Sequence, residues 1–133
     1  MVMVYGTNGL FPSWQCMKPH VLILEDDFII SFDMAGLVTD ILHATPLVVR
    51  SVAAALELIP DDIAFAFLDI EVLDGKSYAV AQKLMDNHIP FIFLTGENRN
   101  LLPEKFSKTP FMSKPVDDKT LIQLTKSLTS AFA

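Results

Sequence analysis

Four segments of this sequence place polar side chains with reactive groups directly after a run of apolar residues. In chain order these side chains are Glu25, Asp26 and Asp27, then Asp69, then Thr95 followed by Gly96, and finally Lys114. Adjacent carboxylates repel one another, and partly desolvated carboxylates are unfavourable unless they are paired or bind a metal ion. The acidic triplet alone also fits an exposed turn in which Asp27 caps a helix. The other three segments are needed to decide between these roles.

Together, these groups fit the transfer of a phosphoryl group to a carboxylate. A carboxylate nucleophile and an anionic phosphorus centre repel each other, and a divalent cation offsets that repulsion. Mg²⁺ prefers oxygen ligands and keeps several waters, so two carboxylates and a backbone carbonyl are enough to bind it. In such a site Lys114 would hold a phosphoryl oxygen as a point charge, and the hydroxyl of Thr95 would donate a hydrogen bond to another oxygen.

These side chains can meet only if the apolar runs before them lie side by side in one sheet. Five continuous apolar runs are typical of strands covered on both faces, as in a parallel sheet: residues 21–24, 47–49, 63–68, 91–94 and 111–112. Ligands of such sheets bind outside the carboxyl ends of the strands. The polar residues that follow the first, third, fourth and fifth runs would then share one edge of the sheet.

Helical patterns lie between these runs. The residues predicted to cap or begin the helices are Asp27, Ser51, Ser77 and Asp117 or Asp118. The first helix is expected to extend to about residue 43, and the last to carry Leu121, Leu124, Leu128 and Phe132 on one face. The segment between residues 95 and 111 has the weakest helical pattern, so a fourth helix there would be short or mobile. Five strands alternating with helices predict an α/β, doubly wound domain with a five-stranded parallel sheet.

Composition places the chain among globular proteins of one domain. It has 133 residues, of which 51% are hydrophobic and 20% are charged, so it can bury a sizeable core. A net charge of −6 and a pI near 4.8 argue against nonspecific binding to nucleic acid or anionic membranes. No apolar run approaches the roughly 20 residues needed to span a bilayer. Cys16 is the only cysteine and no secretion signal is visible, so we expect no internal disulfide and a cytoplasmic location.

The two ends of the chain give further expectations. Residues 1–19 have no sustained periodicity, so we expect an N-terminal extension that is disordered or in part artificial, with Phe11 and Trp14 available to dock on the domain or on a partner. The domain itself is expected over residues 20–133. Because the sequence ends directly after the last predicted helix, we expect no effector domain and an output through protein contacts.

From about residue 20 to residue 133, the chain resembles the receiver domains of two-component response regulators. The resemblance rests on the acidic triplet, Asp69, Thr95 and the Lys114-Pro115 pair, each after its own strand. It implies a flavodoxin-like fold with strand order 2-1-3-4-5 and Mg²⁺ or Mn²⁺ as the cofactor. It also implies that the protein is not an enzyme beyond catalysing its own phosphorylation and dephosphorylation.

The resemblance assigns a role to each of these residues. Asp69 is the expected phosphoacceptor, and Pro115 is often joined to the preceding lysine by a cis peptide bond in this family. The other implied roles are metal binding by Asp26, Asp69 and the backbone carbonyl of Glu71, with support from Glu25; phosphoryl binding and switching by Thr95, Lys114 and Phe111; and modulation by Glu71 and Gly96.

Within the receiver domains, the stretches "PFIFLTGEN", "LDGKSYAVA" and "LLPEKF" resemble a stand-alone subgroup from alphaproteobacteria. That subgroup usually carries a Pro-Phe-x-Phe-Ala-Thr-Gly-aromatic-Gly motif, whereas here Leu94 replaces the alanine and Glu97-Asn98 replaces the aromatic residue and glycine. The implied partner is a sensor histidine kinase, of the HWE or a related type, or a phosphotransfer protein, with no contact to DNA or membranes. The protein would act as a phosphate sink or signal by docking. Residues 96–110 are expected to reorder, because they are poorly helical and next to Thr95.

Two other functions stay open from the sequence. A magnesium-dependent hydrolase of the haloacid-dehalogenase type also uses an aspartate nucleophile and a second acid two residues later, where Glu71 lies. However, Val72 and Leu73 do not continue that motif, the nucleophile would follow the third strand and not the first, and no segment is available to cover a small substrate. The second alternative is an interaction module that has lost phosphorylation. The residues that argue against it are the intact Asp26, Asp69, Thr95 and Lys114.

Overall fold

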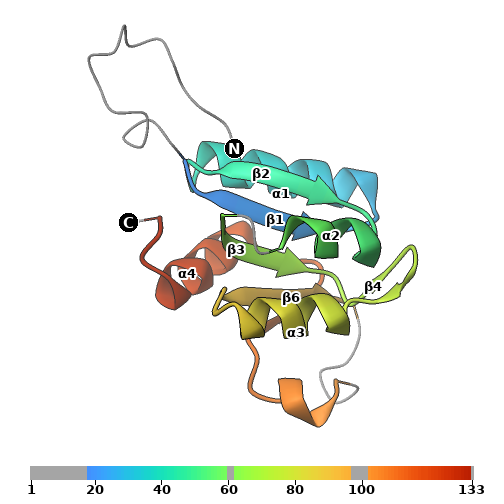
Figure 1. The fold of residues 1–133 in the computed structure, drawn as a ribbon. Helices are drawn as coiled ribbons and strands as arrows, with labels where there is room; N and C mark the ends of the chain where they lie inside the picture. Colours follow the sequence, from blue (N-terminus) through green and yellow to red (C-terminus); the bar gives the residue numbers. More distant parts are fainter. Residues whose placement is uncertain (1–17, 60–61, 97–101, 133) are drawn as a thin grey trace, which may run out of the picture.

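The computed structural model describes residues 18–59, 62–96 and 102–132, which form a central sheet with helices on both faces (Figure 1). The strands of this sheet are β1 (His20–Leu24), β2 (Thr45–Val49), β3 (Ile63–Leu68), β6 (Phe91–Thr95) and β7 (Phe111–Ser113). All neighbouring strands are parallel, and their order is β2-β1-β3-β6-β7. Counted along the chain, these five strands therefore follow the order 2-1-3-4-5, which confirms the predicted flavodoxin-like fold.

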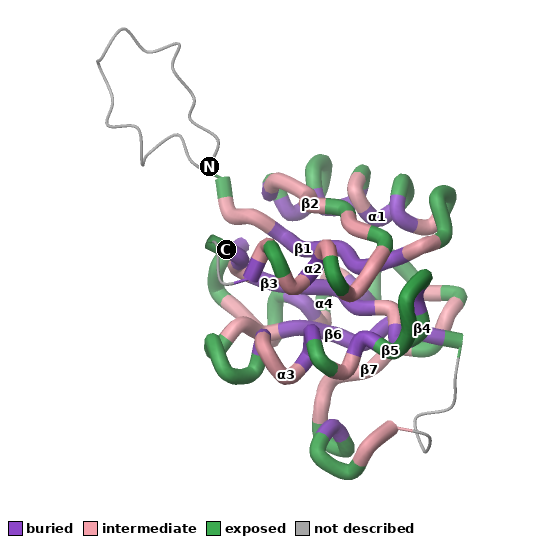
Figure 2. The backbone as a smooth tube through the Cα atoms, turned by 45° about the vertical axis from the view of Figure 1, so that its right-hand side comes forward, coloured by how far each residue is buried: buried purple, intermediate pink, exposed green. Residues whose placement is uncertain are grey.

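Four α-helices within the described residues cover the sheet: α1 (Phe28–Asp40), α2 (Val52–Leu58), α3 (Tyr78–Asp86) and α4 (Asp118–Leu128). Helices α1 and α4 share one core with the strand residues Phe65 and Phe67. Helices α2 and α3 share a second core on the opposite face, to which β3 contributes Ala66 and Leu68. Figure 2 shows that the buried residues concentrate in the strands between the two helix layers. The sheet is thus buried on both faces, as its continuous apolar runs predict.

Three helices begin with the predicted cap, whose side chain accepts a hydrogen bond from a backbone N–H group. The bonds are Ile30 N–H to Asp27 (3.0 Å), Ala54 N–H to Ser51 (3.1 Å) and Thr120 N–H to Asp117 (2.9 Å). They satisfy N–H groups that have no partner inside a helix. Ser77 also occupies the N-cap of α3, but it makes no capping bond, and its buried hydroxyl has no hydrogen-bond partner among the described residues.

Two expectations about helix ends are wrong. Helix α1 ends at Asp40 and not near residue 43, where the φ of His43 is 53°. A residue in this left-handed region cannot continue a right-handed helix. Helix α4 ends at Leu128, so Phe132 lies beyond the helix and not on its face. Its ring is still buried and packs edge-on against Phe65, with ring centroids 6.2 Å apart.

A short antiparallel hairpin, which the sequence analysis did not predict, follows β3. Its strands are β4 (Glu71–Val72) and β5 (Gly75–Lys76), with two residue pairs between them. Figure 1 shows the hairpin projecting from the edge of the sheet where β3 ends, close to the start of α2. The Asp74-Gly75 pair in its turn is a known hairpin signal, but the flanking segments are too short to show a strand period.

The segment with the weakest helical pattern contains one turn of 3-10 helix, η3 (Glu104–Phe106), in its described part. This agrees with the expected short fourth helix. Phe106 anchors the turn, because its side chain is fully buried in the core of the α2–α3 face. Residues 97–101 of this segment lie outside the described residues. So does most of the expected N-terminal extension, including Phe11 and Trp14.

Replacement of Phe93 by alanine is expected to lower the free energy of unfolding by about 3–5 kcal/mol. The reason is that Phe93 is fully buried and its ring makes edge contacts with the rings of Tyr78, Phe91 and Phe106. Urea unfolding measures the loss. The matched control is Phe32→Ala, at a side chain that is 70% exposed on α1, where the change should stay within about 0.5 kcal/mol. Equal losses in the two variants would contradict the assigned core.

Candidate functional site

Three carboxylates meet where β1 and β3 end. Glu25 and Asp26 follow β1, and Asp69 follows β3, which pairs with β1 up to Leu24 and Leu68. The backbone continues this pairing for one more step, because the N–H group of Asp69 donates to the carbonyl of Leu24 at 2.9 Å. One oxygen from each of the three carboxylates lies within 4.8 Å of the other two. The structure therefore brings these predicted residues together in one acidic cluster.

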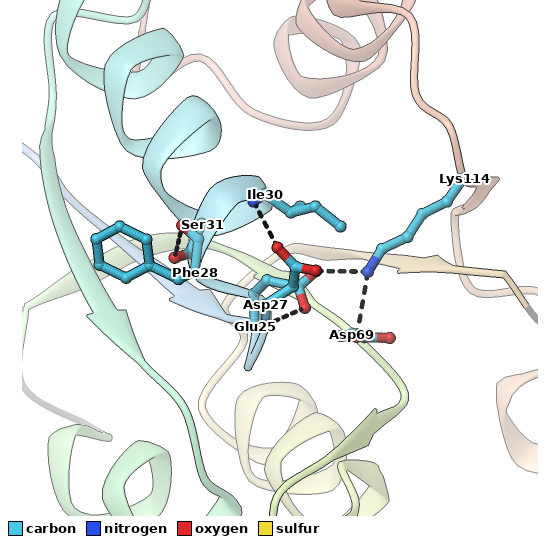
Figure 3. A network of polar contacts seen from close by, with 7 residues as sticks. All are labelled: Glu25, Asp27, Phe28, Ile30, Ser31, Asp69 and Lys114. Atoms are coloured by element: carbon cyan, nitrogen blue, oxygen red, sulfur yellow. Dashed lines mark hydrogen bonds and ion pairs between the residues drawn. The ribbon is translucent and has the colours of Figure 1, made fainter.

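Lys114 reaches into the acidic cluster from the end of β7. Its ammonium nitrogen lies 2.5 Å from Oε1 of Glu25 and 3.2 Å from Oδ2 of Asp69 (Figure 3). Its backbone N–H group donates to the carbonyl of Thr95 at 2.9 Å, which fixes the start of the side chain beside the end of β6. The peptide bond between Lys114 and Pro115 is cis, as the resemblance to receiver domains implied. One ammonium thus contacts two carboxylates that come from two different strands.

Burial and pairing shift the pKa values of this ion pair. Burial raises the pKa of the Glu25 carboxyl, while the hydrogen bonds from Lys114 and from the N–H group of Asp27 oppose that shift. For Lys114, burial is the largest single influence and favours the neutral amine. The hydrogen bond to Glu25 and the charges of Asp69 and Glu25 together outweigh it and raise the pKa. Lys114 is therefore an ammonium at neutral pH.

The donor set of the acidic cluster fits a hard divalent cation. Among the described residues, its three carboxylates outnumber the one ammonium that contacts them, and Mg²⁺ and Mn²⁺ take oxygen ligands of this kind. The side chain of Glu71 is not part of the cluster. It is exposed in the hairpin, where its carboxylate lies 3.4 Å from the ammonium of Lys76. Its backbone carbonyl as a metal ligand stays a prediction.

The predicted switch residues lie at the ends of β6 and β7. Thr95 is the last residue of β6 and is buried, whereas Gly96 after it is exposed. Phe111 is the first residue of β7, pairs with Phe93 in the sheet and packs half-buried against the core of the α2–α3 face. Phe111 therefore lies three residues before Lys114, at the other end of β7, whereas the backbones of Thr95 and Lys114 are joined by a hydrogen bond.

Comparisons with solved structures identify the family of this chain. SdrG from Sphingomonas melonis Fr1 is 30% identical, with a TM-score of 0.71, and the match covers 83% of this chain and 95% of that one. The REC domain of the response regulator PhyR from Erythrobacter litoralis is 23% identical (TM-score 0.71, covering 85% and 91%). A CheY-like response regulator receiver domain from Methylobacillus flagellatus is 21% identical (TM-score 0.70, covering 85% and 99%). This chain belongs to the response regulator receiver domains. No protein-family model and no curated protein matches it.

In this receiver domain, Asp27 has the capping role that its sequence position allowed. Its side chain caps α1, and its N–H group donates to Oε2 of Glu25 at 3.1 Å, which helps to orient the buried carboxylate. Asp27 therefore acts on the cluster through its backbone.

The described helices include none that is long and apolar enough to cross a membrane.

Two further contacts of the receiver domain were missed from the sequence. The guanidinium of Arg50, directly after β2, donates to the backbone carbonyl of Asp26 at 2.9 Å. The carboxylate of Asp74, in the hairpin, accepts from the N–H groups of Val52 and Ala53. No residue period marks either contact, although Asp74-Gly75 is a turn signal.

Replacement of Lys114 by methionine is expected to lower the free energy of unfolding by about 1–3 kcal/mol at pH 7, measured in the presence of a chelator. The change leaves the Glu25 carboxylate buried without its ammonium, so its folded-state pKa rises further above the ordinary 4.5. A carboxyl whose folded pKa is raised stabilises the fold below that ordinary pKa, and this contribution is lost as the pH rises. The deficit of the variant should therefore shrink toward pH 4.

The double variant Lys114→Met/Glu25→Gln is the control for this prediction. It removes the charge that the single variant leaves unpaired, so part of the stability at pH 7 should return. A deficit that is the same at pH 4 and pH 7 would show that Glu25 does not depend on Lys114.

Proposed function

We propose that this receiver domain accepts a phosphoryl group on Asp69 from a sensor histidine kinase or a phosphotransfer protein, with Mg²⁺ or Mn²⁺ bound beside it. The observation that carries the proposal is the contact of the Lys114 ammonium with both Glu25 and Asp69, inside a cluster of three carboxylates. Asp69 is only partly buried, so a phosphodonor can reach it. The metal ligands would be Asp26, Asp69 and the backbone carbonyl of Glu71, with Glu25 in support.

In the proposed reaction, a carboxylate oxygen of Asp69 attacks the phosphorus of a phosphohistidine. The bond from this oxygen to phosphorus forms while the phosphorus–nitrogen bond breaks, and the imidazole leaves with its electron pair and takes a proton from water. The cation supplies charge compensation between the carboxylates and the phosphoryl oxygens. Lys114 already lies 3.2 Å from Asp69, so its ammonium can exchange this contact for one with a phosphoryl oxygen.

The proposed switch uses Lys114, Thr95 and Phe111. Phosphorylation adds a charge of roughly −1.5 to −2, which draws the ammonium of Lys114 and the hydroxyl of Thr95 toward the new oxygens. Phe111 has no hydroxyl and is half-buried, so its alternative positions would differ in packing alone. Glu71, at the start of the hairpin, would tune the lifetime of the phosphoryl group, and Gly96 would leave room for the chain after β6 to move.

An exposed apolar surface on α1 is the proposed docking site for the kinase. Phe28, Ile29 and Phe32 are each at least 70% exposed, and the rings of Phe28 and Phe32 stack with centroids 6.5 Å apart. Exposed apolar groups that lie together often mark contact sites. Helix α1 starts directly after the acidic cluster, so a partner bound there can bring its histidine to Asp69. The loops after β3 and β7 would complete this rim.

For the output, we favour a phosphate sink over signalling by docking. We also propose that the protein is a stand-alone receiver of the alphaproteobacterial subgroup. The support for the subgroup is the part of its motif that this chain keeps, Pro-Phe-x-Phe followed, after Leu94, by Thr95 and Gly96. The net charge of −6 opposes contact with a DNA backbone, since such binding neutralises phosphates. A kinase of the HWE type is the proposed donor, and the cytoplasm is the proposed location.

Incubation with acetyl phosphate and Mg²⁺ is expected to add one phosphoryl group to the wild-type protein, as measured by intact mass. The variant Asp69→Asn and the wild type in chelator should not be labelled, because the first lacks the nucleophile and the second lacks the cation. The matched control is Asp62→Asn, at an exposed carboxylate that precedes β3 at the other end of the strand. Normal labelling of Asp69→Asn would refute the phosphoacceptor. An unlabelled wild type would favour the interaction module that has lost phosphorylation.

In a mixture of a histidine kinase and a competing regulator, adding this protein is expected to lower phosphorylation of the competitor. Asp69→Asn should not do so, because it cannot drain the phosphoryl group. If the variant suppresses the competitor equally well, occlusion of the kinase explains the effect and the sink is wrong.

The same assay tests the docking surface on α1. The double variant Phe28→Ala/Phe32→Ala should lose most of its phosphorylation by the kinase and keep its labelling by acetyl phosphate, since only the kinase needs the surface. Met85→Ala is the control, because Met85 is also exposed but lies on α3. Loss of both reactions in the double variant would point to damage at the site itself.

A further inference from the structure

The tip of the hairpin after the phosphoacceptor is held against α2 by the side chain of Asp74, and Val72 in β4 packs into the core of the α2–α3 face. The two carboxylate oxygens of Asp74 accept one hydrogen bond each, from the N–H group of Val52 at 2.7 Å and from that of Ala53 at 3.1 Å. These are the first two N–H groups of α2, which lack partners within the helix. The two bonds also lower the pKa of the Asp74 carboxyl, so it is ionised at neutral pH.

Without outside contacts, this hairpin would have little stability of its own. It has only two residue pairs, Glu71 with Lys76 and Val72 with Gly75, and isolated two-stranded hairpins are marginal in water. The turn is also not of the type preferred in two-residue hairpins, because Gly75 has a positive φ but neither Leu73 nor Asp74 has one. Val72 anchors β4 in the core, whereas Leu73 in the turn is exposed, so the position of the hairpin tip depends on the contact of Asp74 with α2.

The segment that receives Asp74 also contacts the acidic cluster. Residues 50–53 run from the end of β2 into the first turn of α2, and we call them the β2–α2 segment. At one end of this segment, Arg50 donates to the backbone carbonyl of Asp26. At the other end, Val52 and Ala53 donate to Asp74. The β2–α2 segment thus contacts both the backbone of the acidic triplet that follows β1 and the tip of the hairpin.

We infer that Asp74 is a positioning residue that, through the β2–α2 segment, sets the separation between Asp26 and Glu71 and thereby the affinity for the divalent cation. The inference rests on the proposed function, in which Asp26 and the carbonyl of Glu71 bind that cation. Glu71 lies two residues after Asp69 and opens the hairpin, so movement of the hairpin moves its carbonyl. Asp74 is not among the proposed ligands of the cation, and its carboxylate is bonded to the N–H groups of α2, so it would act by positioning alone.

The test is a Mg²⁺ titration of the full chain, followed by the NMR shifts of backbone amides, for the wild type and three variants. Asp74→Ala should raise the Kd for Mg²⁺ about tenfold, which is typical when a residue that orients metal ligands is lost. Asp74→Asn should have a smaller effect, because its amide oxygen can still accept one of the two bonds. Ser51→Ala is the matched control, since it removes the other cap of α2 and leaves the hairpin fastened, so its Kd should equal that of the wild type.

Amide hydrogen exchange without metal gives a second readout. Residues 71–76 should exchange faster in Asp74→Ala than in the wild type and in Ser51→Ala. Equal Kd values in Asp74→Ala and the wild type overturn the inference. An equal loss of affinity in Asp74→Ala and Ser51→Ala also overturns it, because the cause would then be a loosened α2.

These outcomes separate the inference from the proposed function. If the wild-type protein binds no Mg²⁺, the proposed metal site is wrong, and the proposed effect of Asp74 on the cation is then wrong as well. A wild type that binds Mg²⁺ and is labelled on Asp69, with an Asp74→Ala variant that binds equally well, overturns only the positioning role.

Discussion

The edge of the sheet that carries the site depends on one ammonium group among three carboxylates. Carboxylates that gather at strand ends repel one another, and burial of Glu25 adds a further cost. Lys114 comes from β7, whereas the carboxylates that it contacts follow β1 and β3, so its side chain must pass over the end of β6. Neighbouring strands are about 4.8 Å apart, which makes a long, flexible side chain with a compact charge suitable for this position. The ion pair ties together strands that are not neighbours in the sheet.

The parallel register determines how the ends of the strands line up. Leu24 pairs with both Val49 and Leu68, Leu68 pairs with Phe93, and Thr95, two residues further along β6, pairs with Ser113. Each polar residue of the site comes one or two positions after such a pair, or is the last residue of its strand. The parallel register therefore fixes how far each functional group lies along the strand direction. The order of the strands in the sheet decides which of these groups become neighbours. Contacts such as that of Arg50 with the carbonyl of Asp26 then hold the loops after the strands in place.

The sequence predicted the strands and the acidic cluster because both follow from local patterns. Continuous apolar runs mark buried parallel strands, and ligands collect at their carboxyl ends. The same reasoning could not find the hairpin, whose strands are only two residues long, or the end of α1, which depends on the backbone conformation of His43. It also could not pair Asp74 with α2, since that contact joins residues more than 20 positions apart through the tertiary fold. Local patterns identify elements, whereas such contacts depend on how the elements meet.

The alternation of side chains along β3 limits where this fold can accept insertions. Phe65 and Phe67 point to the α1–α4 face, while the smaller Ala66 and Leu68 point to the α2–α3 face. One residue inserted into β3 would exchange the two faces, placing bulky rings where α2 and α3 approach and smaller side chains where α1 and α4 need filling. Between Phe65 and Leu68, where the pairing with β1 is regular, only changes of two residues keep both cores, and these would displace Asp69 from its neighbours. Insertions that this fold tolerates should therefore lie in its loops. The number of residues between the core side chains of β3 and Asp69 cannot change.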